Sequence, residues 1–240
     1  MREYDFYIVP TPIGNLGDIT NRAVEVLSVV DIIACEDMRV TQKLLNHFSI
    51  GTKCISYHKF NEKERVDKII ELLKSGKKMA LVSDAGTPLF CDPGAILVKA
   101  LKEEGFSVTS LPGANAVVTL LSQVPREAET FTFAGFLPKS KPQIIELINK
   151  YKENDLVFYE SPNRLMATLE LIAETYPNRM VSVGRELTKV FEEVITDKVE
   201  NIIKHFAENP IKGEIVVIIH ASKDKTQIEN LSNEINTLKT

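Results

Sequence analysis

Leu81-Val-Ser-Asp-Ala-Gly-Thr-Pro-Leu-Phe-Cys-Asp-Pro-Gly94 is the stretch of sequence that decides the fold. The apolar run 79–82 predicts a strand, the small and polar residues after it predict a loop, and the final Asp-Pro-Gly predicts the start of a helix. A strand, a small-residue loop and a helix in this order build the ligand-binding edge of an open α/β sheet. Gly86 allows close approach of the backbone to a ligand, Pro88 stiffens the loop, and Asp84 offers an acceptor for a hydroxyl or ammonium group. For the aspartate alone, an Asx-turn that only shapes the loop is the better explanation, and a second loop of the same kind favours the ligand-binding one.

A second loop of the same kind is Val9-Pro-Thr-Pro-Ile-Gly-Asn-Leu-Gly-Asp-Ile-Thr20, which follows a predicted strand at 5–9. Pro12, Gly14 and Gly17 occupy the positions of the three glycines in a dinucleotide-binding G-x-G-x-x-G motif. Proline has a fixed φ and no N–H, so it supplies neither the tight first turn nor a donor to a pyrophosphate. The loop therefore argues against NAD and FAD, and favours a less charged ligand.

The composition is that of a globular protein, with 240 residues, 44% of them hydrophobic and 26% charged. Three cysteines without metal-like spacing predict reduced thiols and, weakly, a cytoplasmic location. We expect no signal peptide, because no basic stretch with an apolar core precedes the predicted first strand. No apolar run is long enough to span a membrane, and the histidines show no metal-ligand spacing. We therefore expect neither a membrane nor a metal among the partners.

The net charge of −4 is unevenly distributed. Residues 36–78 contain ten Lys and Arg against six Asp and Glu, so this segment is basic within an acidic protein. Such a segment fits docking to a phosphate-bearing partner. A solvated helix face is an equally good explanation on composition alone, because acidic residues alternate with the lysines.

Predicted strands and helices alternate along the chain, which indicates an α/β fold of two lobes with mainly parallel sheets. The expected organisation is an N-terminal lobe at 1–123, a polar linker at 124–130, a C-terminal lobe at 131–221 and a polar tail at 222–240 with helical spacing of its apolar residues. Two such lobes would form a cleft, which is a preferred site for a small ligand.

Charged residues follow several of the predicted strands. Glu160-Ser-Pro-Asn-Arg164 and Gly184-Arg-Glu-Leu-Thr-Lys189 follow strands of the second lobe, and Glu36-Asp-Met-Arg39 and His58 follow strands of the first. Helix capping explains the Ser, Pro and Asn of the first cluster, but it leaves Glu160 and Arg164 unexplained. Ion pairs with a purely structural role are the commoner outcome for such clusters.

Taken together, the ordered motifs resemble the tetrapyrrole methylase superfamily, and more closely its ribosomal RNA small subunit methyltransferase branch. The resemblance covers roughly residues 4–220 and rests on eight motifs: Val9-Pro-Thr-Pro-Ile-Gly-Asn-Leu-Gly-Asp18, Cys35-Glu-Asp-Met-Arg39, Ser83-Asp-Ala-Gly-Thr-Pro88, Leu111-Pro-Gly-Ala-Asn-Ala116, Gly135-Phe-Leu-Pro138, Glu160-Ser-Pro-Asn-Arg164, Gly184-Arg-Glu-Leu187 and Lys212-Gly-Glu214. Enzymes of the superfamily that act on precorrin or uroporphyrinogen typically have Gly-Asp-Pro where this chain has Ser83-Asp84-Ala85-Gly86. That departure counts against a tetrapyrrole substrate.

The resemblance implies methyl transfer from S-adenosyl-L-methionine to the 2′-oxygen of a cytidine in the decoding region of 16S ribosomal RNA. It also implies a homodimer that holds the cofactor in the cleft between lobes and acts on 16S rRNA or the small ribosomal subunit. On this basis we expect the cofactor-binding residues to be Pro12, Gly14, Asp84, Gly86, Thr87, Pro88, Ala114, Asn115, Ala116, Phe136 and Leu137.

Strand-end position and charge select the remaining candidates. Residues expected to act in catalysis are Asp37, Arg39, Glu160, Arg185 and Lys189. In this set Asp37 or Glu160 would serve as the base, and Arg185 or Lys189 would stabilise charge. Residues expected to bind RNA are His58, Lys59, Lys63 and Arg164, with Tyr57 or Phe60 as stacking partners for unpaired bases.

Two other functional classes remain open from the sequence. The same fold could act on a corrinoid or on a protein side chain, without dependence on the basic segment. A noncatalytic nucleotide- or RNA-binding module would bind the adenosyl ligand or RNA without methyl turnover.

Overall fold

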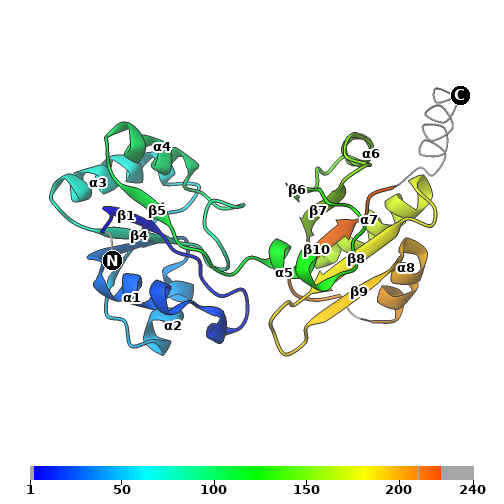
Figure 1. Cartoon of the computed structure of the whole chain (residues 1–240), viewed down its shortest axis with the longest axis horizontal. Coiled ribbons are helices and arrows are strands. Elements are labelled where there is room, and N and C mark those ends of the chain that lie inside the picture. The colour runs from blue at the N-terminus through cyan, green and yellow to red at the C-terminus, as the bar shows by residue number, and fades with distance from the viewer. Residues whose placement is uncertain (1–2, 210, 223–240) are drawn as a thin grey trace, which may run out of the picture. The chain divides into compact units, whose positions relative to one another are not determined.

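The computed structural model describes residues 3–209 and 211–222, so the predicted tail at 222–240 lies almost entirely outside the described residues. The chain divides into two compact units, Met1–Thr119 and Leu120–Thr240, and each is described by itself (Figure 1). The division falls within helix α5 (Ala116–Gln123). Residues 124–130, where the sequence predicts a linker, contain no helix or strand.

The first unit is a doubly wound sheet of five parallel strands in the order β3-β2-β4-β1-β5. Its strands are β1 (Phe6–Ile8), β2 (Ile32–Cys35), β3 (Lys53–Ser56), β4 (Met79–Val82) and β5 (Val108–Ser110). Its helices are α1 (Asn21–Val29), α2 (Met38–His47), α3 (Glu62–Lys74) and α4 (Ala95–Glu103). The strands that the sequence predicts at 5–9 and 79–82 are confirmed as β1 and β4.

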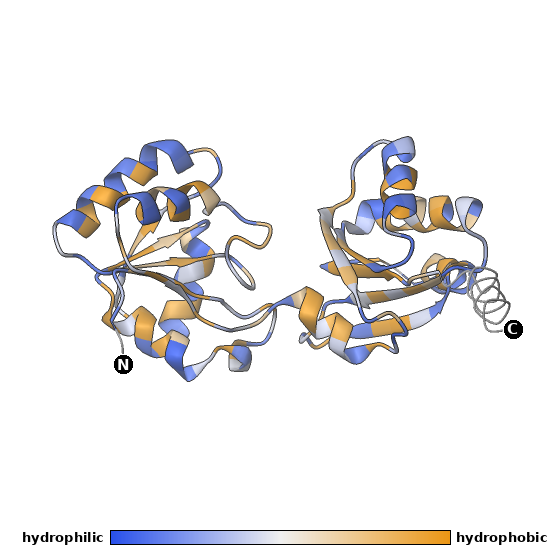
Figure 2. Cartoon of the chain, turned by 45° about the horizontal axis from the view of Figure 1, so that its top comes forward, coloured by the Kyte–Doolittle hydropathy of each residue, from blue (hydrophilic) through white to orange (hydrophobic). Residues whose placement is uncertain are grey.

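Two apolar cores cover the two faces of this sheet. Tyr7 and Val9 of the first strand face a core shared with α1 and α2, whereas Phe6 and Ile8 face a core shared with α3 and α4. Figure 2 shows the apolar strands and the mixed, partly polar helices that cover them. Because both faces are covered, the strands are apolar along their whole length, which is typical of parallel sheets.

The chain order places a switch point between β1 and β4, which lie side by side. From β1 the chain crosses toward β2, and from β4 it crosses in the opposite direction toward β5. Ligands of open α/β sheets bind outside the carboxyl ends of the strands at such a point. The two loops that dominate the sequence analysis are the ones that leave these two strand ends.

The second unit has a mixed sheet in the order β6-β7-β10-β8-β9, in which β6 and β7 are parallel and the other three pairs are antiparallel. Its strands are β6 (Phe131–Phe136), β7 (Asp155–Glu160), β8 (Met180–Arg185), β9 (Glu193–Lys198) and β10 (Ile215–Ile219). Helices α6 (Lys141–Lys150), α7 (Pro162–Thr175) and α8 (Val199–Glu208) pack on the core of this sheet. The α/β class is confirmed, but the pairing differs from the mainly parallel sheet expected for this lobe. The short connection between β8 and β9 allows a hairpin and not a parallel crossover.

Gly113 permits the close approach of the turn after β5 to the end of β1. A Cβ atom at this position would lie 2.5 Å from Cβ and 2.9 Å from Cγ of Pro10, whose ring is rigid. At Gly51, by contrast, a Cβ atom would meet nothing within 4 Å.

We expect Gly113→Ala to destabilise the protein by about 1–3 kcal/mol, because the turn must move to relieve the overlap. Urea denaturation at equilibrium measures this change. Gly51→Ala is the matched control and should leave the unfolding midpoint nearly unchanged. Equal midpoints for the two variants would contradict the prediction, because they would show that the turn accommodates a Cβ atom at position 113 without strain.

Candidate functional site

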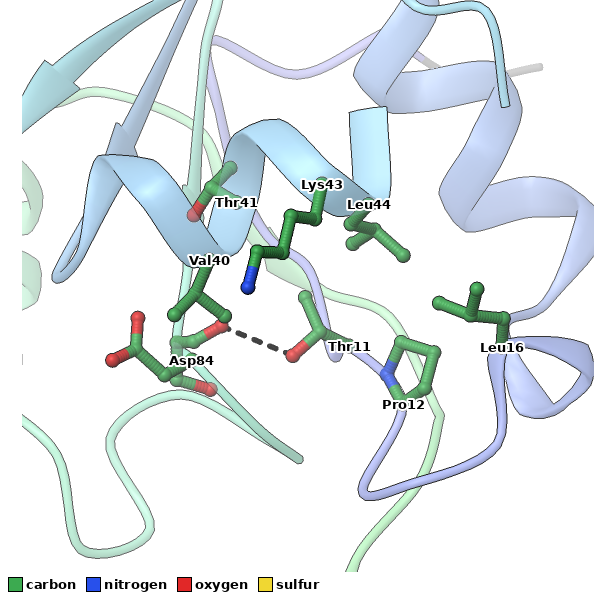
Figure 3. A pocket seen from close by; sticks show the side chains of 9 residues that line it. Thr11, Pro12, Leu16, Val40, Thr41, Lys43, Leu44 and Asp84 are labelled. Carbon is green, nitrogen blue, oxygen red and sulfur yellow. Dashed lines mark hydrogen bonds between the residues drawn. The ribbon is translucent and has the colours of Figure 1, made fainter. Parts of the chain in front are cut away.

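The loops after β1 and β4 are joined by a two-way backbone bridge. The Thr11 amide donates to the Gly86 carbonyl at 2.9 Å, and the Gly86 amide donates to the Thr11 carbonyl at 3.0 Å. The Thr11 hydroxyl also donates to the Ser83 carbonyl at 3.0 Å, which is the dashed line in Figure 3. These bonds turn two separate loops into one rigid edge at the switch point.

Gly86 is required at its position for two reasons. Its φ of +81° is rarely adopted by other residues, and a Cβ atom there would lie 3.3 Å from Cγ2 of Ile13 and 3.6 Å from the Ala114 carbonyl oxygen. The neighbouring Thr87 hydroxyl donates to that same carbonyl at 3.0 Å. The turn at 112–116 is therefore tied to the loop after β4.

The structure brings together most of the predicted cofactor residues of the first unit. Pro12, Asp84, Gly86, Thr87 and Ala114 lie at this one edge of the sheet. Asn115 caps α5, because its side-chain oxygen accepts the Val117 amide at 3.0 Å, and Ala116 is the first residue of that helix. Gly14 lies in the exposed turn after Ile13, and Pro88 is buried beside Thr87.

Three carboxyl groups crowd the ends of β2 and β4. Burial raises the pKa of Glu36 and that of Asp84, and in each case a neighbouring carboxylate raises it further. Burial and then the charge of Glu36 raise the pKa of Asp92 to about 6. One oxygen of Asp84 accepts the Asp37 amide at 3.0 Å. This edge is therefore suited to a cationic ligand, which would relieve the repulsion between these carboxylates.

Asp37 and Arg39 form an ion pair at the start of α2. The Arg39 guanidinium donates to both Asp37 oxygens, at 3.1 and 2.6 Å, and the Arg39 side chain is 88% exposed. These hydrogen bonds lower the pKa of Asp37 to about 2. Asp37 also caps the helix by accepting the Arg39 amide at 2.8 Å.

The loop between β3 and α3 presents an aromatic ring among basic side chains. Phe60 is 94% exposed and stands between Lys59 and Lys63, and its ring lies 6.1 Å from that of His58 in an edge-on arrangement. Tyr57 is 1% exposed and donates its hydroxyl to Glu62 at 2.7 Å. Of the two predicted stacking residues, Phe60 is therefore accessible and Tyr57 is not.

In the second unit, Arg164 holds the segment after β6. Its guanidinium donates to the carbonyls of Leu137 at 3.1 Å and Pro138 at 2.8 Å, and it lies 3.4 Å from Glu160. Both Glu160 oxygens are occupied, one by the Ser161 amide and one by the Thr168 hydroxyl, each at 2.8 Å. Because Glu160 is buried and Arg164 binds the two carbonyls, this pair holds the segment after β6 in place.

Phe136, the last residue of β6, offers an aromatic surface beside the segment that Arg164 holds. Phe136 is 61% exposed, and its ring lies 5.6 Å from that of Tyr159. Leu137, the next residue, is buried. Gly135 has a φ of +66° at an irregularity in the β6–β7 pairing, and this turns the chain at the strand end.

Arg185 and Lys189 are engaged in ion pairs within the second unit. Arg185 donates to Glu193 at 2.9 Å, and Lys189 contacts Glu186 at 2.8 Å and Glu214 at 3.0 Å. These pairs fasten the loop between β8 and β9 to the loop before β10. Asp37 and Asp84 belong to the other unit, so these ion pairs are described for the second unit by itself.

A chain of Ser182, His220 and Asp155 also lies in the second unit. The Ser182 hydroxyl is 2.7 Å from Nε2 of His220, whose Nδ1 is 3.6 Å from Asp155. Although burial raises it, hydrogen bonds from His220, the Ala221 amide and Arg126 hold the pKa of Asp155 at about 2. Ser182 is fully buried within a central strand, so this arrangement lacks the substrate access that a hydrolytic triad needs.

Sequence reasoning missed one face of α2. Val40, Thr41, Lys43 and Leu44 line a pocket together with the loops after β1 and β4 (Figure 3). Val40, Thr41 and Leu44 have the spacing of an ordinary core-facing side of a helix. In the sequence, Lys43 stands out only as one of the positive charges of the basic segment. The spacing of residues in the sequence does not reveal the topology that brings α2 over the switch point between β1 and β4.

Residues 3–209 and 211–222 contain neither a cluster of metal ligands nor a helix suited to a membrane. In this range no group of three or more His, Cys, Asp or Glu is placed to hold a metal ion. Over the same residues, none of the helices has the length and apolar character needed to cross a membrane.

Comparison with known proteins identifies the class. The family model of tetrapyrrole (corrin/porphyrin) methylases matches residues 5–203, and the chain belongs to this family. The resemblance noted in the sequence is thereby confirmed, and methyl transfer is the activity that defines the class.

Curated relatives give a narrower likeness. The chain is 44% identical over 94% of its length to ribosomal RNA small subunit methyltransferase I of Halalkalibacterium halodurans, covering 78% of that protein. It is 45% identical to the Bacillus subtilis protein of the same name, with 91% and 76% of the two chains covered. The Vibrio cholerae protein of that name is 44% identical, with 97% and 82% covered.

Solved structures support the fold. A diphthine synthase superposes with a TM-score of 0.72 at 16% identity, covering 90% of this chain and 89% of the other. A uroporphyrin-III-C-methyltransferase from Thermus thermophilus gives 0.61 at 18% identity, with 89% and 93% covered. At these identities the likeness concerns the fold alone.

The raised pKa of Asp92 leads to a prediction about stability and pH. Below about pH 4 the Asp92 carboxyl is protonated in both the folded and the unfolded chain. Between pH 4 and about 6 it ionises first in the unfolded chain, so the free energy of unfolding falls as the pH rises. We expect Asp92→Asn to gain roughly 1 kcal/mol relative to wild type between pH 4 and 7, because solvent at this half-buried site screens part of the full effect. Denaturant unfolding at several pH values measures this difference.

Asp67→Asn, on the exposed face of α3, controls for the change in net charge. Its stability difference from wild type should stay flat over the same pH range. A flat difference for Asp92→Asn as well would mean that Asp92 ionises freely in the folded protein.

Proposed function

We propose that the protein transfers a methyl group from S-adenosyl-L-methionine to the 2′-oxygen of a cytidine ribose in the decoding region of 16S rRNA. The observation that carries the proposal is the 44% identity, over 94% of the chain, to a ribosomal RNA small subunit methyltransferase I. The geometry of the first unit is consistent with it, because a rigid, acidic edge lies beside a basic surface. Such a substrate would place the enzyme in the cytoplasm.

The residues of the first unit fit the proposed cofactor. S-adenosylmethionine has a positively charged sulfonium and an ammonium group, and the buried carboxylates near Asp84 supply the opposite charge. Gly86 and Thr87 give a close backbone approach, which Gly14, Pro88, Asn115 and Ala116 would extend on either side. In the second unit, the exposed ring of Phe136 and the adjoining Leu137 are proposed to pack on the adenine.

When bound near Asp84 and Gly86, the cofactor would supply an electrophilic methyl carbon for transfer to the ribose oxygen. The protein must hold donor and acceptor in line and exclude water. It must also accept the proton of the ribose hydroxyl. A carboxylate with a pKa of about 2, such as Asp37, is a weak acceptor, and the carboxyl groups of Glu36 and Asp92 are better matched to this task.

The other predicted catalytic residues take roles that follow from their contacts. Arg39, an exposed residue of the basic segment, is proposed to contact RNA phosphate. Glu160 is buried with both oxygens occupied, so we propose that with Arg164 it positions the Phe136–Pro138 segment. Arg185 and Lys189 are proposed to stabilise charge near the substrate, in addition to fastening their loops.

The RNA-binding surface is proposed to lie at the β3–α3 loop. His58, Lys59 and Lys63 would contact the backbone, and the Phe60 ring would stack on an unpaired base. A homodimer that acts on 16S rRNA or on the small ribosomal subunit completes the proposal. Action on a tetrapyrrole is not favoured, since Ser83-Asp84-Ala85-Gly86 departs from the Gly-Asp-Pro of those enzymes.

The direct test is to incubate the protein with methyl-labelled cofactor and undermethylated small subunits, followed by nucleoside mass spectrometry. We expect label in 2′-O-methylcytidine. Gly86→Ala should lower cofactor affinity at least tenfold, because the new Cβ and the positive φ disturb the bridge to Thr11. Gly105→Ala has a similar φ of +83° with nothing within 4 Å, and should bind normally. Label on protein or on a porphyrinoid would overturn the assignment.

The RNA surface is tested by the double variant Lys59→Glu, Lys63→Glu. Losing two phosphate contacts should weaken binding to the small subunit and reduce the slope of log affinity against log salt by roughly 1.4. Filter binding at several salt concentrations gives this slope. Lys99→Glu with Lys102→Glu on α4 is the control with the same change in charge and should keep the wild-type slope. An unchanged slope in the Lys59 and Lys63 variant would place the RNA elsewhere.

A further inference from the structure

A pocket lies beside α2, within the first unit, where the helix packs over the loops after β1 and β4 (Figure 3). Its volume is about 170 Å³. Sites for drug-sized ligands are larger, about 300–1,000 Å³, so this pocket suits a single small ring better than a whole cofactor molecule. The pocket is lined by Thr11, Pro12, Leu16, Val40, Thr41, Lys43, Leu44, Ser83 and Asp84.

The walls of the pocket are mainly apolar. Pro12 and Leu16 form one side, and Val40 and Leu44 of α2 form the other, as Figure 3 shows. Leu16 and Val40 are each 39% exposed, so apolar surface is available for burial by a ligand. Apolar walls of this kind pack well on the faces of a flat ring.

Two side chains of opposite charge, Lys43 and Asp84, lie at the rim of the pocket. The Lys43 ammonium points back along α2 into the space near Thr11 and Asp84 (Figure 3). The carboxylate of Asp84 lies at the same end of the pocket, beyond Val40 in this view, and one of its oxygens accepts the Asp37 amide. A ring that carries both a hydrogen-bond donor and an acceptor on its edge would satisfy the two groups.

Thr41 lines the pocket without offering it a hydrogen bond. It is 3% exposed, and its hydroxyl is inaccessible and has no hydrogen-bond partner of normal geometry among the described residues. The contact that remains is a weak one with the Cys35 thiol, which is buried in the core. Lys43 and Asp84 therefore supply the polar contacts for a ligand.

Among nucleobases, cytosine matches this arrangement. Its exocyclic amino group donates to carboxylates, and its ring nitrogen and carbonyl accept from an ammonium group. Uracil has a carbonyl in place of that amino group and would bring an acceptor against Asp84. Purines have two fused rings, which fit a pocket of this size less well.

The pocket also adjoins the proposed cofactor site. Pro12 and Asp84 belong to both, whereas Gly86, Thr87 and Ala114 lie on the cofactor side and α2 lies on the other. A ribose attached to a base in the pocket would therefore stand at its mouth, beside the residues that are proposed to hold the methyl donor. Taking the base out of its stack would also bring the 2′-oxygen within reach.

We propose that this pocket receives the unstacked cytosine base of the target nucleotide, with Lys43 and Asp84 reading its edge. The inference rests on the proposed function, and it assigns a base-recognition site and a specificity-determining residue, Lys43.

The experiment uses Val40→Trp, which fills the pocket, and Lys43→Met, which removes the ammonium. Gln42→Ala is the control on the same helix, since Gln42 is exposed and bonds to Asn46. Calorimetry measures affinity for S-adenosylmethionine, and steady-state kinetics use small subunits that carry either cytidine or uridine at the target position. All three variants should bind the cofactor within about twofold of wild type.

We expect Val40→Trp to lower kcat/KM for the cytidine subunits at least a hundredfold, and Lys43→Met at least tenfold. The preference of Lys43→Met for cytidine over uridine should also fall at least tenfold, which a loss of general RNA affinity would not produce. Wild-type kinetics in both pocket variants, or an unchanged base preference in Lys43→Met, would overturn the inference while leaving the proposed function intact. Absence of methyl transfer by the wild-type protein would overturn both.

Discussion

The pair of backbone hydrogen bonds between Thr11 and Gly86 is the constraint on which the rest of the site depends. Strands β1 and β4 are neighbours in the sheet, but the chain leaves them in opposite directions, so nothing in their connections keeps the two loops together. Each bond contributes only about 0.5–1.5 kcal/mol net to stability. Their larger effect is positional, because Pro12 and Asp84 lie directly beside the bridged residues.

Crowded carboxyl groups set the electrostatic character of that edge. Glu36, Asp84 and Asp92 are partly buried near one another, and the pKa of each is raised. Keeping such groups together costs free energy in the folded protein, and a bound cation offsets that cost. The sulfonium and ammonium of the proposed cofactor would have this effect. Because a bound cation favours the ionised form of these carboxyl groups, ligand binding is coupled to proton release at the same edge.

The sequence was enough to predict the first unit almost completely. Its strands are apolar runs bounded by Gly, Pro and Asp, and the motifs at 9–20 and 81–94 mark the switch point between β1 and β4. The second unit was harder, because a strand's apolar pattern carries no direction. The antiparallel pairings of β10 with β7 and β8 depend on tertiary contacts that no local pattern encodes.

Side-chain roles at the site were less predictable than the fold, for a related reason. A charged residue at a strand end is a candidate for catalysis, but its partners decide its role. Glu160 has both oxygens occupied by local donors, and Arg164 binds two carbonyls, which neither motif reveals. The pocket residues of α2 were overlooked, since they have the spacing of an ordinary core-facing helix.

Helix α2 connects these observations. Its first turn carries the Asp37–Arg39 pair, with the guanidinium exposed toward solvent, and its next turn carries Val40 and Lys43 at the pocket. Helix α2 thus sets the separation between Arg39, a cation suited to backbone phosphate, and Lys43, a cation suited to a base edge. Because the Asp37 amide also binds Asp84, the helix is anchored to the acidic edge. A nucleotide held by both cations would be aligned against the switch point by the helix itself, without movement of any loop.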